Sequence, residues 1–333
     1  MILVISHPDD PHAQRVIELL RAQHHDVLLM NLNDLPERAT LTMDYANGGA
    51  PAPGYTLDGS EIDLRQVTSV WWRRPQVADV AAIDDVEVRL FTANEWAEAT
   101  AGLWRLLGDV PWMNDPLLDE AASRKAYQLH VAAQSGLRVP RTLITSDPER
   151  ARRFIAELGI GNVIFKTFSC TYSVWRETRL VRDGDLEMLD AVRFAPVIFQ
   201  EYIPADVDLR ITAVGPTLFP AAIHSQSTDY PVDFRMSLGQ AAVEATQLPD
   251  DMRERLASVM RRLGLVYGAI DVRRTPDGDH VFLEVNTAGE FLFVEERTGQ
   301  PIAQTVADRL ARPSANGRAH APRRRKAAER TPS

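Results

Sequence analysis

Three oxygen-bearing side chains lie on two apolar strands in the last third of the chain. Glu284 and Asn286 are two positions apart in one strand, so they project from the same face. Asp271 lies in the preceding strand, and Asp277-Gly278 between the strands is a strong signal for a two-residue hairpin turn. A turn there without a bulge sets Asp271 opposite Glu284 and Ala269 opposite Asn286, and cross-strand partners share a face.

One face of this predicted hairpin therefore presents two carboxylates and an amide. The other face is predicted to enter a core through apolar side chains only, namely Ile270, Val272, Val281, Leu283 and Val285. Three oxygen ligands without His or Cys suit a hard cation, Mg²⁺ or Mn²⁺, rather than zinc. A solvated face of an antiparallel sheet is the alternative interpretation, because a mixture of acids and amides is ordinary there.

Lysine is rare in this chain, and its positions indicate a second feature. The 37 Lys and Arg residues include only three lysines, of which Lys326 lies in the tail and Lys125 and Lys166 lie in the body. A compact ammonium is not interchangeable with a planar guanidinium where a phosphate needs a point charge in a tight space. Lys125 and Lys166 are therefore candidate phosphate contacts.

Other residues have two open interpretations. The pair Arg73 and Arg74 suits an anionic substrate group, and equally a structural ion pair with nearby acids. His224 with Asp229 could act as a general base, although a hydrogen-bonded structural histidine is favoured. Cys170 is interpreted as a bystander thiol rather than a nucleophile. The adjacent indoles Trp71 and Trp72 are expected at the core and a domain interface.

The composition excludes several classes of protein. The 333 residues are 45% hydrophobic and 25% charged, with a net charge of −9. Residues 313–333 carry a net +5, which leaves −14 for residues 1–312 and argues against nucleic acid as a partner. A single cysteine excludes a disulfide framework. No apolar run approaches the roughly 20 residues of a membrane span, and the opening strand is not a signal peptide, so we expect a cytoplasmic protein without membrane partners.

Strand and helix patterns indicate an α/β (α+β) fold in three parts. Residues 1–110 begin with a βαβ-like pattern that lacks the G-x-G-x-x-G turn of dinucleotide-binding folds. Residues 111–204 and residues 205–312 form two further units, each with helices and strands. The tail at 313–333 has no apolar residues beyond alanine and is predicted to be a disordered solubilising terminus, with a specific anchor as the alternative.

Seven short features, in this order along the chain, resemble the ATP-grasp ligases. They are Lys125 on a helix, Lys166 ending a strand, "FQEYI" at 199–203, "DLR" at 208–210, "DFR" at 233–235, "AIDVRR" at 269–274 and "FLEVNTAGEF" at 282–291. The resemblance covers about residues 111–312. It implies an ATP-grasp fold behind an N-terminal pre-ATP-grasp domain.

The resemblance also implies a role for each matching residue. The nucleotide phosphates would be held by Lys125 and Lys166. The adenine pocket would be lined, through backbone groups, by Gln200, Glu201, Tyr202 and Ile203, and the ribose would meet Asp208. The transferred phosphoryl group would be neutralised by Arg210 and Arg235. Two Mg²⁺ ions, or Mn²⁺ in their place, would be bound by Asp271, Glu284 and Asn286, with Glu284 bridging.

This set suits phosphoryl transfer, which needs positioning and charge neutralisation more than a protein nucleophile. The expected reaction begins when a substrate carboxylate attacks the γ-phosphate of ATP and becomes an acyl phosphate. An amine or hydroxyl then attacks the acyl phosphate and forms an amide or ester.

Within the ATP-grasp ligases, the chain most resembles the graspetide (microviridin-type) synthetases. The matching segments are "ILVISHPDDP" at 2–11, "SVWWRRP" at 69–75, "GLRVPRTLITSDP" at 136–148 and "EERTGQPIA" at 295–303. The resemblance implies an enzyme that recognises the leader of a precursor peptide and joins core Asp or Glu side chains to Thr, Ser or Lys. A homodimer is also implied.

Two segments depart from the family pattern. Residues 167–175 contain no glycine, although ATP-grasp phosphate loops usually do, and "NTAGEF" at 286–291 replaces an "NPNGQW"-like sequence. Two other functions therefore stay open. One is an ATP-grasp ligase that adds a free amino acid or joins small molecules, as ribosomal-protein glutamate ligases do, and the other is a non-catalytic ATP- or peptide-binding partner.

Overall fold

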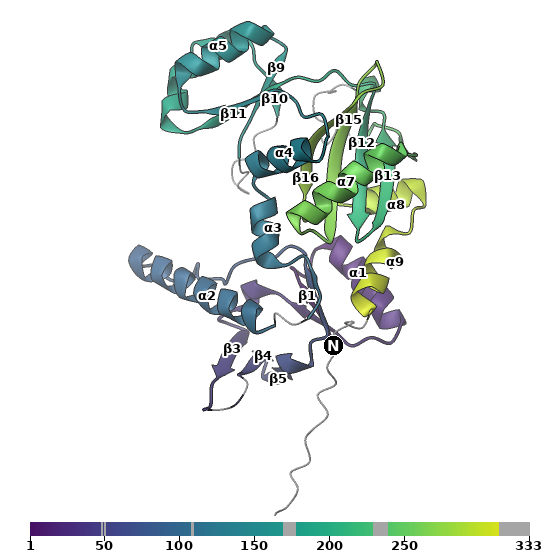
Figure 1. Cartoon of the computed structure of the whole chain (residues 1–333). Coiled ribbons are helices and arrows are strands. Elements are labelled where there is room, and N and C mark those ends of the chain that lie inside the picture. The colour runs from purple at the N-terminus through teal and green to yellow at the C-terminus, as the bar shows by residue number, and fades with distance from the viewer. Residues whose placement is uncertain (48, 50, 108–109, 169–177, 229–238, 313–333) are drawn as a thin grey trace, which may run out of the picture.

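The computed structural model describes most of the chain in three parts (Figure 1). The described residues are 1–47, 49, 51–107, 110–168, 178–228 and 239–312. The expectations for Cys170, Asp229, Arg235, the glycine-free segment and the tail at 313–333 lie wholly or largely outside these residues. Within the described residues, no helix combines the length and the apolar character needed to cross a membrane.

The N-terminal part is built on a four-stranded parallel sheet of order β2-β1-β6-β7. Its strands are β1 (Ile2–Ile5), β2 (Val27–Met30), β6 (Ser69–Trp72) and β7 (Trp112–Met113). Helix α1 (Pro11–Ala22) begins at Pro11 because the Asp10 carboxylate accepts a hydrogen bond from the His12 amide and caps the first turn. The chain runs from β1 to β2 on one side of β1 and returns to β6 on the other.

Two smaller features complete this part. A three-stranded antiparallel sheet contains β3 (Ala39–Asp44), β4 (Ala52–Leu57) and β5 (Ser60–Asp63), and the long helix α2 (Val86–Leu106) is capped by Asp85. Short 3-10 turns lie at Leu32–Asp34 and Leu64–Gln66. Helix α3 (Pro116–Ala122) follows β7 and leads to the second part (Figure 1).

The central part is a four-stranded antiparallel sheet of order β10-β9-β11-β8. Its strands are β8 (Thr142–Thr145), β9 (Val163–Lys166), β10 (Arg179–Leu180) and β11 (Val197–Glu201). Helix α5 (Pro148–Leu158) has the Asp147 cap, the Pro148 start and the Gly159 end that the sequence signals indicate. The short helices α6 (Asp183–Leu186) and Leu189–Phe194 pack beside α5 in one apolar cluster.

The C-terminal part is a five-stranded antiparallel sheet of order β14-β13-β12-β15-β16. Its strands are β12 (Val207–Val214), β13 (Thr217–Ile223), β14 (Val243–Ala245), β15 (Tyr267–Arg274) and β16 (His280–Asn286), with a 3-10 turn at Ser225–Ser227. Helices α4 (Lys125–Gln134) and α7 (Asp250–Leu263) cover one face through a shared apolar core. This sheet supplies the hairpin on which the candidate metal ligands stand.

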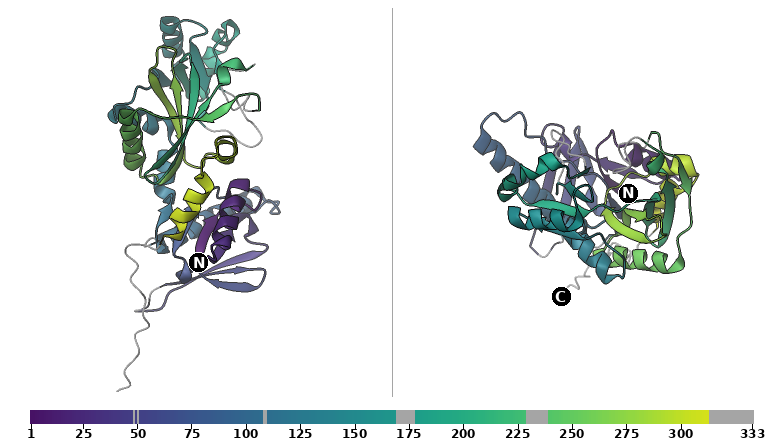
Figure 2. Two further views of the ribbon diagram at one scale, coloured as in Figure 1. Left: turned by 90° about the vertical axis from the view of Figure 1, so that its right-hand side faces the viewer. Right: turned by 90° about the horizontal axis from the view of Figure 1, so that it is seen from above.

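The first and last parts of the chain are joined through one core. After α8 (Leu292–Thr298), helix α9 (Ile302–Ala311) returns to the N-terminal part and packs against α1 (Figure 2). Buried side chains from β1, α1 and β6 form one cluster with those of β12, α8 and α9. The N-terminal part is therefore packed directly against the elements that follow the candidate metal ligands.

Candidate active site

The register of the hairpin β15–β16 places the predicted ligands together. Asp271 lies opposite Glu284, and Ala269 lies opposite Asn286, as predicted. Asp271 is buried, Glu284 is half-buried and Asn286 is exposed, so the three run from the middle of the strand pair towards its end away from the hairpin loop and become more open in that direction. Two carboxylates and an amide suit Mg²⁺, which takes oxygen ligands and leaves further positions for phosphate oxygens.

The predicted turn was wrong, although the pairing at the site was right. Arg274 pairs with His280, and the Thr275 amide bonds to the Asp279 carbonyl, so the loop is longer than two residues. Gly278 adopts a positive φ of 91°, which suits the left-handed position of such a loop. A bulge between Asp271 and Val272 then restores the pairing at Asp271.

The bulge also changes which side chains enter the core. Phe282 lies opposite Val272 and joins the core cluster, whereas Val281 lies opposite Arg273 on the other face. Leu283, the extra residue of the bulge, is only half-buried. The prediction was therefore wrong for the face of Val281, which is nevertheless fully buried, and for the burial of Leu283, because a register change between the turn and the site inverts the faces.

Asp271 is balanced by an arginine from the neighbouring strand. Arg210 of β12 lies opposite Asp271 in the sheet, and its Nη1 donates to both carboxylate oxygens at 2.8 and 3.0 Å. The two side chains are 6% and 10% exposed. Burial alone would lower the pKa of the Arg210 guanidinium, but the Asp271 charge raises it, so the arginine stays charged. The cation expected to neutralise a phosphoryl group thus stands beside a predicted metal ligand.

Glu284 is balanced by the lysine that opens α4. The Lys125 Nζ lies 2.5 Å from Glu284 Oε2. Gln128, one turn further along the helix, fixes α4 to β16: its amide oxygen accepts from the Val285 amide at 2.9 Å, and its Nε2 donates to the Val285 carbonyl at 2.7 Å. Sequence reasoning found Lys125 but missed Gln128, because a single glutamine in a helix gives no local signal.

Several of the predicted nucleotide-binding residues lie at the ends of strands β9 and β11 of the central sheet. Lys166 ends β9 opposite Ile198, while the Gln200 side chain is buried and donates to Thr142 Oγ1 at 2.8 Å. Glu201 accepts from the Arg141 amide at 3.1 Å. The backbone of the segment is also fixed, since the Tyr202 amide donates to the Asn162 carbonyl.

Asp208 is buried in a polar network of the C-terminal sheet. Its carboxylate accepts from Arg273 Nε at 2.8 Å and from the Ser225 hydroxyl. Arg273 also donates to the Ile203 carbonyl at 2.9 Å and lies over the Tyr202 ring. If Asp208 contacts a ribose, its carboxylate must accept that hydrogen bond in addition to those from Arg273 and Ser225. Arg273 thus connects the predicted ribose and adenine residues, a link that sequence spacing could not reveal.

The two candidate substrate arginines differ in their surroundings. Arg73 is 1% exposed, and its guanidinium donates to Asp10 at 3.1 Å and to the carbonyls of Ala288 and Gly289 at 2.7 and 2.9 Å. Arg74 is half-buried and pairs with Glu290 at 3.1 Å. Both arginines thus make structural ion pairs, and Arg74 is the more accessible of the two.

The loop after the predicted metal ligands packs closely between these groups. A Cβ at Gly289 would lie 2.3 Å from the Ala269 Cβ and 3.0 Å from Arg210 Nη2, so only glycine fits there without movement. Tyr267 donates to the Gly289 carbonyl at 2.7 Å. The Asn286 side chain accepts from the Ala288 amide at 3.0 Å. The segment "NTAGEF" is therefore a fixed wall of the site.

A buried histidine supports the same loop from the N-terminal part. His12 Nδ1 accepts from the amides of Phe291 and Leu292 at 3.4 Å. Burial and then the Arg73 charge lower the pKa of His12 to about 4, so the ring is neutral at pH 7. Burial alone would raise the pKa of Asp10, but Arg73 and the Ser6 hydroxyl bring it below its ordinary value.

His224 and the adjacent tryptophans have the surroundings of structural residues. His224 Nε2 lies 3.0 Å from the Glu244 carboxylate on an exposed surface. Trp71 is fully buried in the core that joins the first and last parts of the chain, while Trp72 is half-buried. These positions agree with the structural interpretations.

Two family models together match nearly the whole described chain. Residues 122–310 match the RimK-like ATP-grasp domain, and residues 1–119 match the MvdD pre-ATP grasp domain. Among curated proteins, a probable alpha-L-glutamate ligase of Enterobacter sp. is 28% identical over 205 residues, which are 60% of this chain and 67% of that protein. A ribosomal protein bS6–L-glutamate ligase of Escherichia coli O81 is 28% identical over 67% of this chain and 75% of its own.

Solved structures match over a greater length. Macrocyclase MdnC of Microcystis aeruginosa MRC, bound with precursor peptide MdnA, has a TM-score of 0.82 and 29% identity over 93% of this chain and 99% of its own. A Chryseobacterium gregarium RiPP-associated ATP-grasp ligase, in complex with ADP and a leader and core peptide, has a TM-score of 0.81 and 26% identity over 93% and 96%. The chain therefore belongs to the RimK-like ATP-grasp ligases and has an MvdD-type pre-ATP-grasp domain at its N-terminal end.

Proposed function

We propose that this enzyme activates Asp or Glu side chains of a ribosomal precursor peptide as acyl phosphates and closes ester or amide crosslinks, as a graspetide synthetase. The observation behind the proposal is the pairing of Asp271 with Arg210 and of Glu284 with Lys125 on one hairpin. The likeness to MdnC, a macrocyclase solved with its precursor peptide, supports a peptide as the substrate.

Each group of candidate residues would have its own role in the first step of the reaction. Lys125 and Lys166 would bind the phosphates of ATP, and Asp271, Glu284 and Asn286 would hold two Mg²⁺ ions, or Mn²⁺, which withdraw charge from the phosphate oxygens when bound. A peptide carboxylate oxygen attacks the γ-phosphorus, and ADP leaves. Arg210, fixed by Asp271, would neutralise the transferred group together with Arg235.

The second step forms the crosslink. A hydroxyl or amine of the same peptide attacks the acyl carbon, loses its proton, and displaces inorganic phosphate. Each ring thus removes one water from the peptide in total. Because the attacking and leaving groups both belong to the substrate or to ATP, the enzyme needs to supply only position and charge.

Further parts of the proposal concern assembly and location. We propose a cytoplasmic homodimer that recognises the leader of its precursor and has no nucleic-acid or membrane partner. The proposed domain boundaries lie at residues 110, 204 and 312, and the first of them falls just before β7 (Trp112–Met113), which pairs with β6 in the N-terminal sheet. Gln200 to Ile203 would contact adenine through backbone groups, and Asp208 would meet the ribose. Arg74 is the better candidate of the two adjacent arginines for an anionic substrate group, since it is half-buried rather than buried.

A second candidate function has a specific observation in its favour. Curated relatives that match this chain include glutamate ligases, with identities of 24–28%. An enzyme of that kind would pass the acyl group to the amine of a free amino acid rather than to the same peptide. The two functions differ in the product: a ring loses water, whereas an addition gains the mass of a residue.

The test is mass spectrometry of candidate precursor peptides, taken from short reading frames around the gene of this enzyme, after incubation with the enzyme, ATP and Mg²⁺. We expect the loss of one or more waters. Glu284→Gln removes one carboxylate charge from the metal site with little change of shape, and should reduce the product at least 100-fold. An unchanged peptide with continued ATP hydrolysis would favour the glutamate-ligase candidate, and neither reaction would favour a binding protein.

A further inference from the structure

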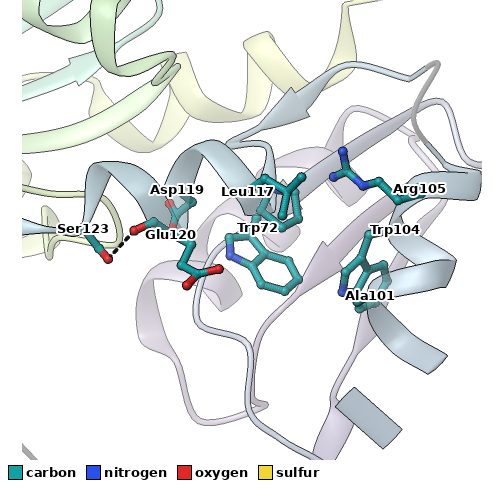
Figure 3. A pocket seen from close by; sticks show the side chains of 9 residues that line it. Trp72, Ala101, Trp104, Arg105, Leu117, Asp119, Glu120 and Ser123 are labelled. Carbon is teal, nitrogen blue, oxygen red and sulfur yellow. Dashed lines mark hydrogen bonds between the residues drawn. The ribbon is translucent and has the colours of Figure 1, made fainter. Parts of the chain in front are cut away.

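A pocket of about 390 Å³ lies beside the site, between α2, α3 and the end of β6 (Figure 3). Its apolar walls include Trp72, Trp104 and Leu117, and its polar lining includes Asp119 and Glu120. The pocket opens at the carboxyl ends of the parallel strands β6 and β7, where ligands of open parallel sheets usually bind.

Two indoles form a rigid wall of this pocket. The rings of Trp72 and Trp104 are 5.6 Å apart in an edge-to-face arrangement, and Trp104 packs in the same way against Trp112 at 6.2 Å. Trp104, on α2, is 5% exposed, so its packing against Trp72 and Trp112 holds it in place. The π-face of an indole attracts a cation more strongly than that of any other aromatic side chain.

The charges in the pocket are mainly negative. Figure 3 shows the Glu120 carboxylate beside the Trp72 indole, with Arg105 towards the opposite end. Arg105 is held by Asp115 at 3.2 Å. Glu120 pairs with Arg124 at 2.6 Å, but both side chains are about two-thirds exposed, so this surface pair is weak and can exchange for another cation.

The pocket is connected to the loop after the predicted metal ligands through Asn114. Asp119 accepts a hydrogen bond from Asn114 Nδ2 at 3.1 Å, and the same amide nitrogen lies 3.5 Å from the carbonyl of Thr287, the residue directly after the predicted ligand Asn286. Trp72 directly precedes Arg73 and Arg74 in the chain. A peptide that reaches the predicted phosphoryl-transfer site could therefore place a neighbouring side chain in this pocket.

We propose that the pocket receives the side chain of a lysine or arginine of the peptide substrate and anchors the peptide beside the site. This inference rests on the proposed function. The aliphatic stem of such a residue would cover the apolar walls, while its charged end would meet the half-buried Trp72 indole and Glu120. An apolar side chain would cover the carboxylates without giving them a partner, which is unfavourable.

The experiment measures binding without catalysis. The full chain is labelled with 5-fluorotryptophan, and its six tryptophan signals are assigned with the aid of Trp72→Phe and Trp104→Phe. The probe is Nα-acetyl-lysine amide, and Nα-acetyl-norleucine amide is the control that keeps the stem without the ammonium. We expect saturable shifts at Trp72 and Trp104 with the lysine probe, and a Kd about tenfold weaker for norleucine.

Two matched variants identify the carboxylate. Glu120→Gln should weaken binding of the lysine probe about tenfold, whereas Glu149→Gln, which removes another exposed helical pair with an arginine, should leave it unchanged. Equal binding of both probes, no saturable shift at the two tryptophans, or an unchanged Glu120→Gln would overturn the proposal.

This readout is independent of the ligase reaction. ATP and the precursor peptide are absent from the titration, so a failure of the proposed function would appear only in the mass-spectrometric assay. If the pocket binds a basic side chain of the precursor, one Lys or Arg of the precursor should be needed for tight binding. Replacing the basic residues of the precursor by glutamine, one at a time, should raise KM for the precursor about tenfold at one position. No effect at any position would overturn the anchoring role.

Discussion

At the scale of single residues, the site is a set of charges that are balanced before any ligand is considered. Asp271 and Glu284 each face a cation from a different element, Arg210 from β12 and Lys125 from α4. Removing one partner of a buried pair costs more than the pair contributes, because the remaining charge is left without a counter-ion. Substitutions that remove a charge at this site are therefore best compared with substitutions of nearby residues that change no charge.

Gly289→Ala is a sharp test at this scale because it changes no charge. The added Cβ would lie 2.3 Å from the Ala269 Cβ and 3.0 Å from Arg210 Nη2, so the loop or the arginine must move. We expect a loss of about 1–3 kcal/mol in the free energy of unfolding and at least a tenfold loss of ligase activity.

Gly54→Ala is the matched control for this substitution. Gly54 lies in β4, and an added Cβ there has no neighbour within 4 Å. Urea unfolding and product formation are measured for both variants. Near-identical behaviour of Gly289→Ala and Gly54→Ala would show that the loop does not constrain the site.

His12 makes the stability of the fold depend on pH. Its pKa is lowered to about 4 in the folded chain, against an ordinary value near 6.5, so the unfolded chain takes up the proton first as the pH falls. Stability from His12 is therefore complete above about pH 6.5 and is lost towards pH 4. Between about pH 7.5 and pH 5 the loss should be about 2 kcal/mol.

Urea unfolding at the two pH values checks this expectation. His12→Gln should reduce the difference between the two pH values by about 2 kcal/mol, whereas His130→Gln, on an exposed position of α4, should leave it as in the unchanged protein. The same pH dependence in all three proteins would mean that His12 does not titrate in this way.

At the scale of elements, the hairpin β15–β16 shows what the sequence could and could not predict. The alternation of apolar and polar residues correctly predicted the two strands, and the facing pair Asp271 and Glu284 was also correctly predicted. The Asp277-Gly278 signal gave a turn of the wrong length, and an unforeseen bulge compensated for it. The extra residue in the loop shifts the strand pairing by one position, and the extra residue in the bulge shifts it back, so the pairing at Asp271 is the predicted one. Neither extra residue leaves a distinct local pattern in the sequence.

Longer-range partners were beyond sequence reasoning for a different reason. The motif around Asp208 was found, but its partners Arg273 and Ser225 are set by the order of the strands in the sheet. The family resemblance indicated candidate residues individually, whereas their contacts with one another depend on the three-dimensional fold. Gln128 is another example, since its importance comes only from the approach of α4 to β16.

Gln128→Leu tests the connection between α4 and β16. The change leaves the Val285 amide and the carbonyls of Val285 and Ala122 without their buried partner, so we expect a loss of about 2–4 kcal/mol in the free energy of unfolding. Because Lys125 begins the same helix, its contact with Glu284 should also loosen, and KM for ATP should rise.

Gln134→Leu is the control on the same helix. Its amide accepts from Arg262 on an exposed surface, so its loss should change stability by less than about 0.5 kcal/mol. Chemical unfolding and steady-state kinetics distinguish the two positions. If Gln128→Leu proved as stable and as active as Gln134→Leu, the helix would not depend on this clamp.

At the scale of the whole molecule, the N-terminal part is a structural partner of the site rather than a separate module. Its strands and helix α1 share one buried core with α8 and α9, and the candidate metal loop lies between that core and Arg210. Arg73 is the main polar contact across this joint. Its guanidinium lies within about 6 Å of three ring centres while it donates to the loop carbonyls.

Arg73→Lys should separate positioning from binding. An ammonium can keep the charge pairing with Asp10, but it cannot also reproduce the planar contacts with the carbonyls of Ala288 and Gly289. We expect kcat to fall about tenfold or more while the Kd for ATP stays within about twofold, because the predicted nucleotide-binding residues lie on other elements. Arg38→Lys, at an exposed pair with Asp58 in the same part, should change neither constant. A loss of ATP affinity equal to the loss of kcat would show instead that Arg73 acts through the general stability of the fold.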